Sequence, residues 1–332
     1  MRQLVVFLVF ILQQIWITGQ QLSYDSFMDH LNGLEIESDY SGALEYLLSY
    51  ESAFPEQWFT LSKEQIYLNE KMQRYVDNLN VLKEGHQRGF FYFLHTAIPR
   101  YKPYLEYPEF GELLETDRQL YSKALEKSST IYQVVLPTGF NPDFDYRLFI
   151  IFHGGNSNFQ KVRNHWNDDL LNTRFIKVYL QSYRHFDSES FTWRSGDPRS
   201  DGDIMRIYRE ILNIYPVDTT SIVLGGMSAG ASYAIGMALR GVIPVTGFIA
   251  FCPGLPQEMS SDTAMSKLRT VIRGYMLGGE NDYYQEQQER LCEIFDQIGL
   301  ECLYVREEGM SHQYPKNESK YIREGLHFIM KD

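Results

Sequence analysis

From about residue 130 onward, short runs of apolar residues alternate with stretches whose apolar positions recur at helical spacing. The run at 148–152 is apolar throughout, as expected of a strand that is buried on both faces of a sheet. The other expected strands lie at 131–136, 175–180, 222–224, 248–251, 271–277 and 302–305. Because strands that alternate with helices form βαβ units, this region is predicted to be α/β, with a mostly parallel sheet covered on both faces.

The stretches between these runs carry apolar stripes on one helical face. One stripe consists of Ile204, Ile207, Tyr208 and Ile211, preceded by the capping candidates Asp201 and Asp203. A second stripe, between the last two expected strands, consists of Leu291, Ile294, Phe295 and Ile298. Ligands of such sheets bind at the carboxyl ends of the strands, so the reactive residues are expected in the loops that follow them.

The region before residue 129 is patterned differently and is predicted to be almost wholly helical. One expected helical face consists of Ala43, Leu44, Leu47 and Leu48. The runs that begin at Tyr40 and Tyr75 match in their Tyr and Leu positions, a spacing close to that of a tetratricopeptide repeat. A helical bundle with coincidental spacing explains the match equally well. Three prolines are expected to interrupt the helices before a last helix at 113–125: Pro99, Pro103 and Pro108.

The first twenty residues have the composition of a secretory leader. Arg2 is followed by a mostly apolar stretch at 4–17, and small and polar residues at 18–20 end it. This apolar core is short for a spanning helix, so residues 1–20 are predicted to be a signal peptide, although an uncleaved anchor or a buried strand is an alternative. The expected domains are therefore a leader at 1–20, a helical domain at 21–128 and a catalytic domain at 129–332 of a secreted or periplasmic protein.

Composition excludes some partners. The net charge of −12 disfavours nucleic acid and anionic membrane surfaces, which require a cationic face. The three cysteines include Cys252 in an apolar run, where a small buried residue is expected, and a pair, Cys292 and Cys302, that could form a disulfide. No Cys/His spacing suits a metal site, so we expect no metal.

The strongest chemical signal is Gly226-Met227-Ser228-Ala229-Gly230, between an expected strand and a small apolar helix at 232–239. A serine on such a sharp turn needs small neighbours because the turn is crowded. The start of the following helix also favours negative charge that develops near the hydroxyl. Ser228 is therefore the predicted nucleophile, and a merely structural glycine-rich turn is the alternative.

A glycine pair follows the strand at 148–152, in His153-Gly154-Gly155-Asn156. Consecutive glycines let the backbone come close to a substrate, so its N–H groups can meet the negative charge of an acyl-transfer intermediate. Gly155 or Asn156 is expected to supply one N–H and Ala229 the other; the sequence leaves open which loop amide points inward. A tight structural turn is the alternative for this loop.

A serine nucleophile needs a base, and the base needs a carboxylate to orient it. Beyond Ser228 the histidines are His312, in a loop after an expected strand, and His327, in an apparent helix where a packed or solvated role is expected. His312 is therefore the predicted base. Asp282 follows the preceding strand and is the predicted acid, with Glu280 as the alternative.

The order of the predicted serine, aspartate and histidine along the chain, with the motifs around them, resembles that of the α/β-hydrolase superfamily. Within it, the resemblance is to the esterase branch of phospholipase/carboxylesterase-like, polyhydroxybutyrate-depolymerase-like and feruloyl-esterase-like enzymes. The resemblance covers 130–330 and rests on these motifs: Leu136-Pro137, His153-Gly154-Gly155, Leu180-Gln181-Ser182, Trp193, Tyr215-Pro216-Val217-Asp218, Gly226–Gly230, Gly279-x-x-Asp282 and Gly309-x-x-His312. It implies a Ser–His–Asp triad that works through an acyl-enzyme without a cofactor. The chain departs from many members at Ala231, where they have glycine.

We therefore expect a serine hydrolase that cleaves a carboxylic ester, either a small molecule or one linked to a polymer. Trp193 and Tyr283 are expected to line the substrate pocket. Three arginines are candidates for an acidic substrate, although a solvated loop explains them better: Arg184, Arg194 and Arg199. The alternatives are a serine peptidase on the same fold, and a helical-repeat interaction protein whose hydrolase domain is weak or inactive. The helical domain is a candidate surface for a protein partner.

Overall fold

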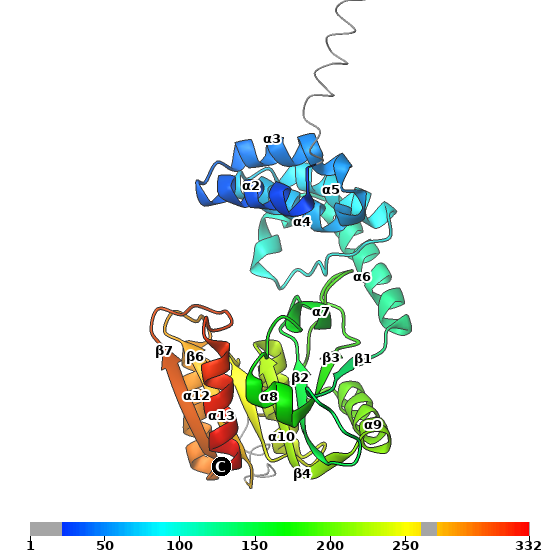
Figure 1. Cartoon of the computed structure of the whole chain (residues 1–332). Coiled ribbons are helices and arrows are strands. Elements are labelled where there is room, and N and C mark those ends of the chain that lie inside the picture. The colour runs from blue at the N-terminus through cyan, green and yellow to red at the C-terminus, as the bar shows by residue number, and fades with distance from the viewer. Residues whose placement is uncertain (1–21, 260–270, 332) are drawn as a thin grey trace, which may run out of the picture. The chain divides into compact units, whose positions relative to one another are not determined.

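The computed structural model describes residues 22–259 and 271–331 (Figure 1). The chain divides into two compact units between Leu120 and Tyr121, inside helix α6 (Glu109–Lys127), whereas the sequence placed the change after residue 128. The expected leader at 1–20 lies outside the described residues. Within the described stretches, every helix is too short or too polar to cross a lipid bilayer.

The first unit begins with two pairs of helices. They are α2 (Tyr24–Ile36) with α3 (Tyr40–Tyr50), and α4 (Trp58–Lys71) with α5 (Tyr75–Gln87); the short 3₁₀ helices η1 (Glu51–Ala53) and η2 (Pro55–Gln57) lie between the pairs. The two matching runs of the sequence therefore form the first turns of α3 and α5. Ala43 and Leu47 are buried against α2, but Leu48, expected on the same face, is half exposed. The tetratricopeptide-like organisation stays a prediction.

The three prolines do not interrupt an α-helix. Pro99 and Pro103 lie within a 3₁₀ helix, η3 (Pro99–Glu106), and α6 begins at Glu109, directly after Pro108 and four residues earlier than expected. A 3₁₀ helix tolerates these prolines because its turns are short and leave few N–H groups to satisfy. The buried Tyr104 packs on Phe110 of α6, so this irregular segment belongs to the core of the first unit.

The second unit is built on one seven-stranded sheet with the order β1-β3-β2-β4-β5-β6-β7. The strands are β1 (Ile131–Val135), β2 (Tyr146–Phe152), β3 (Phe175–Gln181), β4 (Val217–Met227), β5 (Gly247–Phe251), β6 (Arg273–Gly279) and β7 (Glu301–Glu307). All neighbouring strands are parallel except β1, which pairs antiparallel with β3. The predicted α/β class and mostly parallel sheet are confirmed, and the carboxyl ends of β2 and β4 to β7 meet at one edge.

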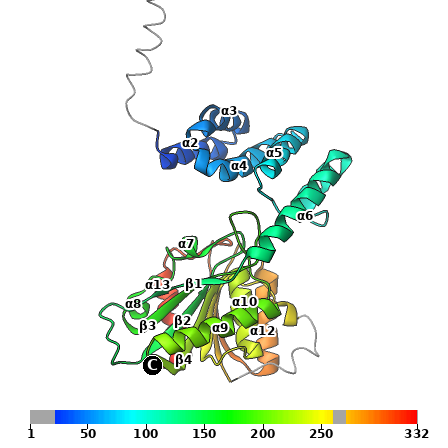
Figure 2. The same cartoon turned by 90° about the vertical axis from the view of Figure 1, so that its right-hand side faces the viewer.

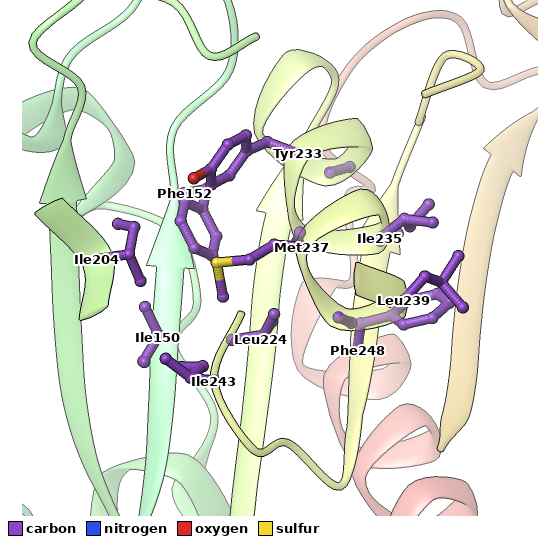
Figure 3. Close-up of a cluster of buried hydrophobic side chains, with 14 of the residues drawn as sticks. Ile150, Phe152, Ile204, Leu224, Tyr233, Ile235, Met237, Leu239, Ile243 and Phe248 are labelled. Carbon is purple, nitrogen blue, oxygen red and sulfur yellow. The ribbon is translucent and has the colours of Figure 1, made fainter. Parts of the chain in front are cut away.

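Helices cover both faces of this sheet (Figure 2). They are α7 (Phe159–Val162), α8 (Asp169–Arg174), α9 (Pro198–Ile214), α10 (Ala229–Arg240), the 3₁₀ helix η4 (Gln257–Met259), α12 (Gln285–Ile298) and α13 (Glu318–Met330). Side chains of α9, α10 and α12 form the core on one face, while α7, α8 and α13 contribute to the core on the other. Figure 3 shows Tyr233 and Met237 of α10 beside Phe152 and Leu224 of the sheet.

The start of α9 differs from the expectation. Asp197 is its N-cap and accepts a hydrogen bond from the Arg199 N–H, and Pro198 occupies the first turn. Asp201, a capping candidate in the sequence, lies inside the helix and binds Arg240 and the Tyr233 hydroxyl instead, and Asp203 also lies inside it. The start of the helix was expected too late because it was judged from the apolar stripe, whereas the first turn of α9 is polar and precedes that stripe.

The cysteines are all free thiols. Cys252 is fully buried, as its apolar run predicts. Cys292 of α12 and Cys302 of β7 both pack against the core beneath α12, without forming the disulfide that the sequence allowed.

Candidate active site

The candidate nucleophile lies where β4 ends and α10 begins. Ser228 adopts φ +53° and ψ −121°, a conformation that L-residues rarely adopt, and its N–H donates to the Phe251 carbonyl at 2.8 Å. The flanking glycines leave room for this turn. A Cβ on Gly226 would lie 2.5 Å from the Gly230 carbonyl carbon, and one on Gly230 would lie 2.3 Å from the His153 oxygen. The Gly-x-Ser-x-Gly pattern therefore has a steric cause in the crossing of α10 with β2 and β4.

Three side chains from the carboxyl ends of different strands meet at this turn. The His312 Nε2 lies 2.8 Å from the Ser228 Oγ, and its Nδ1 lies 2.9 Å from the Asp282 Oδ1. Asp282 follows β6 and His312 follows β7, so the parallel strands bring together residues that are 84 positions apart in sequence. The structure thus brings together the serine, histidine and aspartate that the sequence singled out.

The alternatives lie elsewhere. Glu280 accepts a hydrogen bond from the Gly309 N–H and is exposed, so it stabilises the loop that carries His312 without contacting the imidazole. His327 is exposed on α13. The loop geometry therefore separates Asp282 from Glu280, which the sequence alone left open.

Asp282 is a buried carboxylate with many hydrogen-bond donors. Burial on its own would raise the pKa of Asp282, but hydrogen bonds outweigh burial and hold this pKa below its usual value. The donors are the Tyr284 N–H, His312, the Cys252 thiol and the Gln288 amide. The carboxyl is therefore ionised near neutral pH and able to orient the imidazole.

Cys252 was expected only as a small buried residue, but it belongs to this cluster. It follows β5 with φ +49°, and its Sγ lies 3.5 Å from the Gln313 carbonyl oxygen. Burial first, and then the charge of Asp282, raise the pKa of the Cys252 thiol above its usual value, so the sulfur keeps its proton and remains a donor. The only sequence signal for this contact was the position of Cys252 directly after a buried strand.

The Gly154–Gly155 loop lies against the nucleophile turn. A Cβ on Gly154 would lie 3.8 Å from the Ser228 Cβ, and one on Gly155 would lie 3.7 Å from the Ala229 Cβ. Asn156 has φ +51°, and its Oδ1 accepts a hydrogen bond from the Ser190 hydroxyl at 2.8 Å. Ala229 is the first residue of α10, where a backbone N–H has no partner within the helix.

His153 orients the peptide that joins the two glycines. Burial lowers the pKa of His153 to about 4, so the ring is neutral, and its Nε2 accepts from the Ser182 N–H at 3.2 Å. Its Nδ1 must then carry the proton and donate to the Gly154 carbonyl, 2.6 Å away. In a trans peptide the N–H points opposite to the C=O, so the Gly155 N–H points away from His153.

The two expected pocket residues have different environments. Trp193 is almost fully buried in the core, and its ring packs on Phe152 at 5.1 Å and on Tyr233 at 5.0 Å, so its place in the pocket wall stays a prediction. Tyr283 is 70% exposed, and its ring centroid lies 4.2 Å from that of His312. Of the two, Tyr283 alone lies beside His312.

The three arginines are not gathered at Ser228. Arg199 stacks on the Tyr183 ring and donates a hydrogen bond to the Leu125 carbonyl. Arg184 and Arg194 line a separate cavity of about 450 Å³. None of them contacts the serine, histidine or aspartate of the cluster in the described part of the chain.

One group in the described residues has spacing suited to a metal ion: Cys252, Asp282 and His312, whose ligand atoms lie within 4.8 Å of one another. The same atoms are engaged in the hydrogen bonds described above, and His312 also contacts Ser228.

No family model and no curated protein matches this chain. Among solved structures, it is similar to an uncharacterized protein from Bacillus cereus, at 19% identity and a TM-score of 0.52, covering 93% of this chain and 99% of the other. It is also similar to a ferulic acid esterase, at 16% identity and a TM-score of 0.50, covering 64% of this chain and 95% of the other. A Bacillus cereus carboxylesterase aligns at 13% identity with a TM-score of 0.47, covering 64% and 98%. With the parallel sheet and the serine turn, the two likenesses at TM-scores of 0.52 and 0.50 show that the second unit has the α/β-hydrolase fold, preceded by a region of helices.

Proposed function

We propose that this protein is a serine hydrolase that cleaves carboxylic esters through an acyl-enzyme, with Ser228 as nucleophile, His312 as base and Asp282 as the orienting acid. The observation that carries the proposal is the continuous hydrogen-bond chain Ser228–His312–Asp282, with links of 2.8 and 2.9 Å, at the turn before α10. This geometry matches the requirement that a nucleophile and its base lie within hydrogen-bond reach while a third group orients the base.

In the first half-reaction, the His312 Nε2 takes the proton of the Ser228 hydroxyl as the oxygen attacks the acyl carbon. Asp282 holds the proton of the other ring nitrogen and stabilises the imidazolium that forms. His312 then gives the proton to the leaving alcohol, which departs and leaves the acyl group on Ser228. In the second half-reaction, water attacks this acyl-enzyme with His312 again as base, and the acid is released.

The negative charge that develops on the substrate oxygen needs donors that are already in place. The Ala229 N–H at the start of α10 is one candidate, and the dipole of this helix supports it. The Gly155 N–H, turned away from His153, is the second candidate, with the Asn156 N–H as the alternative from the same loop. Tyr283, exposed beside His312, is proposed to contact the substrate.

The test is hydrolysis of a p-nitrophenyl ester series, from acetyl to longer acyl chains, by residues 21–332. Ser228→Ala should lose several orders of magnitude in kcat, because the nucleophile is removed. Ser49→Ala, an exposed serine on α3, is the matched control and should retain activity. Turnover of peptides but not of esters, abolished by Ser228→Ala, would replace the ester proposal with a peptidase. Absence of both activities would favour an interaction protein.

A further inference from the structure

A glutamine lies on the apolar face of α12, beneath the candidate acid. Gln288 precedes Leu291 by about one helical turn and is fully buried. Its Nε2 donates to the Asp282 Oδ2 at 2.9 Å, and its Oε1 accepts from the Tyr304 hydroxyl of β7 at 3.2 Å. Burying an amide costs free energy unless it is hydrogen-bonded, and both ends of the Gln288 amide have a partner.

The space for this amide comes from a glycine in the neighbouring strand. A Cβ on Gly278 of β6 would lie 1.9 Å from the Gln288 Oε1 and 2.9 Å from the Tyr304 hydroxyl. Gly278 therefore leaves room for the contact between Gln288 and Tyr304. Asp282 defines the orientation of the amide: because an ionised carboxylate can only accept, the NH₂ group of Gln288 faces Asp282 and its Oε1 faces the Tyr304 hydroxyl.

The Gln288 contact acts on the carboxylate oxygen that His312 does not touch. The Asp282 Oδ1 accepts from His312 and from the Tyr284 N–H, whereas its Oδ2 accepts from Gln288. The terminal torsion of an aspartate is broad, so donors on one oxygen alone leave the plane of the carboxylate poorly defined. A donor at Oδ2 restricts that plane and keeps Oδ1 directed at the imidazole.

We infer that Gln288 is a positioning residue for the hydrolytic reaction: it holds Asp282, through Oδ2, in the orientation that directs the His312 imidazole at Ser228. The inference rests on the proposed function. The hydrogen-bond chain then runs from Tyr304 through Gln288, Asp282 and His312 to Ser228. Side chains of β7 and α12 thereby help to orient Asp282. Gln288 itself touches no reacting atom.

The Gln288→Met variant tests this role because methionine fills a similar volume without a donor. We expect kcat for a p-nitrophenyl ester to fall by about 10- to 100-fold, by analogy with the loss found when a group that orients a metal ligand is removed, with KM unchanged. The remaining donors to Asp282 keep the loss well below that of Ser228→Ala. Gln285→Met places the same change three residues earlier on α12, where the side chain donates to Glu289, and should retain wild-type kcat.

The Gln288→Glu variant supplies a readout that a purely structural role would not change. A glutamic acid can donate to the Asp282 Oδ2 only while it is protonated. Burial and the neighbouring carboxylate would raise the pKa of the new Glu above its usual value. The kcat of Gln288→Glu should therefore approach the wild-type value at acidic pH and fall as pH rises, over a range where the wild-type rate does not fall.

The two variants are measured beside wild type and Ser228→Ala, with thermal unfolding recorded for each. A loss of kcat in Gln288→Met at constant KM, together with the alkaline loss in Gln288→Glu, supports the inference. Wild-type kcat in Gln288→Met, or parallel pH profiles for Gln288→Glu and wild type, overturns it while the proposed function stands. Activity that is absent from wild type, or unaffected by Ser228→Ala, overturns the proposed function itself.

Discussion

The backbone of Ser228 should lower the stability of the fold, and replacing its side chain by glycine should reveal this. A residue with a Cβ held at φ +53° and ψ −121° costs about 1–3 kcal/mol, and glycine removes that cost. Glycine also makes the unfolded chain more flexible, which offsets about 0.4–1 kcal/mol. Relative to Ser228→Ala, the Ser228→Gly variant should therefore gain about 1.3 kcal/mol at the midpoints of these two ranges, and at most about 2.6 kcal/mol. Both variants lose the hydrogen bond to His312, so that loss cancels.

The gain should appear as a higher Tm. For a unit of the size of Tyr121–Asp332, 1 kcal/mol corresponds to about 2–4 °C, so Ser228→Gly should melt roughly 3–5 °C above Ser228→Ala by calorimetry. The same pair of changes at Ser232, inside α10 and with ordinary helical φ, should give the opposite order, because glycine weakens a helix relative to alanine. A Ser228→Gly variant that melts at or below Ser228→Ala would refute the argument from backbone strain.

Three further predictions follow from the packing. Gly230→Ala places a Cβ 2.3 Å from the backbone oxygen of His153, just after β2. Thermal unfolding should therefore show a loss of at least about 1–3 kcal/mol in the free energy of unfolding, and the rate of ester hydrolysis should fall strongly. A wild-type Tm would contradict the steric argument. Because the folded-state pKa of His153, about 4, lies below that of a free imidazole, about 6.5, the unfolded chain binds its proton first. In urea titrations, the free energy of unfolding of the wild type should thus fall as pH is lowered from about 6.5 to about 4, and the His153→Asn variant should lose this contribution. Equal pH dependence in the two proteins would show that His153 is not held in its neutral form in the folded state. Trp193→Phe should lower the free energy of unfolding by about 0.5–3 kcal/mol and, if Trp193 acts only in the core, leave KM for esters unchanged; a large rise in KM would place Trp193 in the pocket wall.

Much of the second unit could be predicted because its strands are buried on both faces. Short, continuous apolar runs such as 148–152 are typical of strands buried on both faces, and they marked β2 and β5 to within two residues. The direction of β1 could not be predicted, since an edge strand of mixed pattern fits either orientation. The turn at Ser228 was recognisable in the sequence because Gly226 and Gly230 are required sterically, and this requirement leaves a local sequence pattern.

Other features depended on contacts between distant segments. Trp193 resembles a pocket residue in sequence, and only its packing on Phe152 and Tyr233 identifies it as core. Gln288 did leave a signal, a polar residue one turn before Leu291 on an apolar stripe, but its partner could not be named without the loop after β6. The choice between Asp282 and Glu280 likewise required the loop geometry, because both follow the same strand.

The central claim, that Ser228 is a nucleophile activated by His312, is tested most directly by covalent labelling with a fluorophosphonate followed by peptide mass spectrometry. The account predicts one stoichiometric adduct, on the peptide that contains Ser228, and labelling slowed by orders of magnitude in His312→Gln. An adduct on a different serine, or equal labelling rates in wild type and His312→Gln, would contradict it.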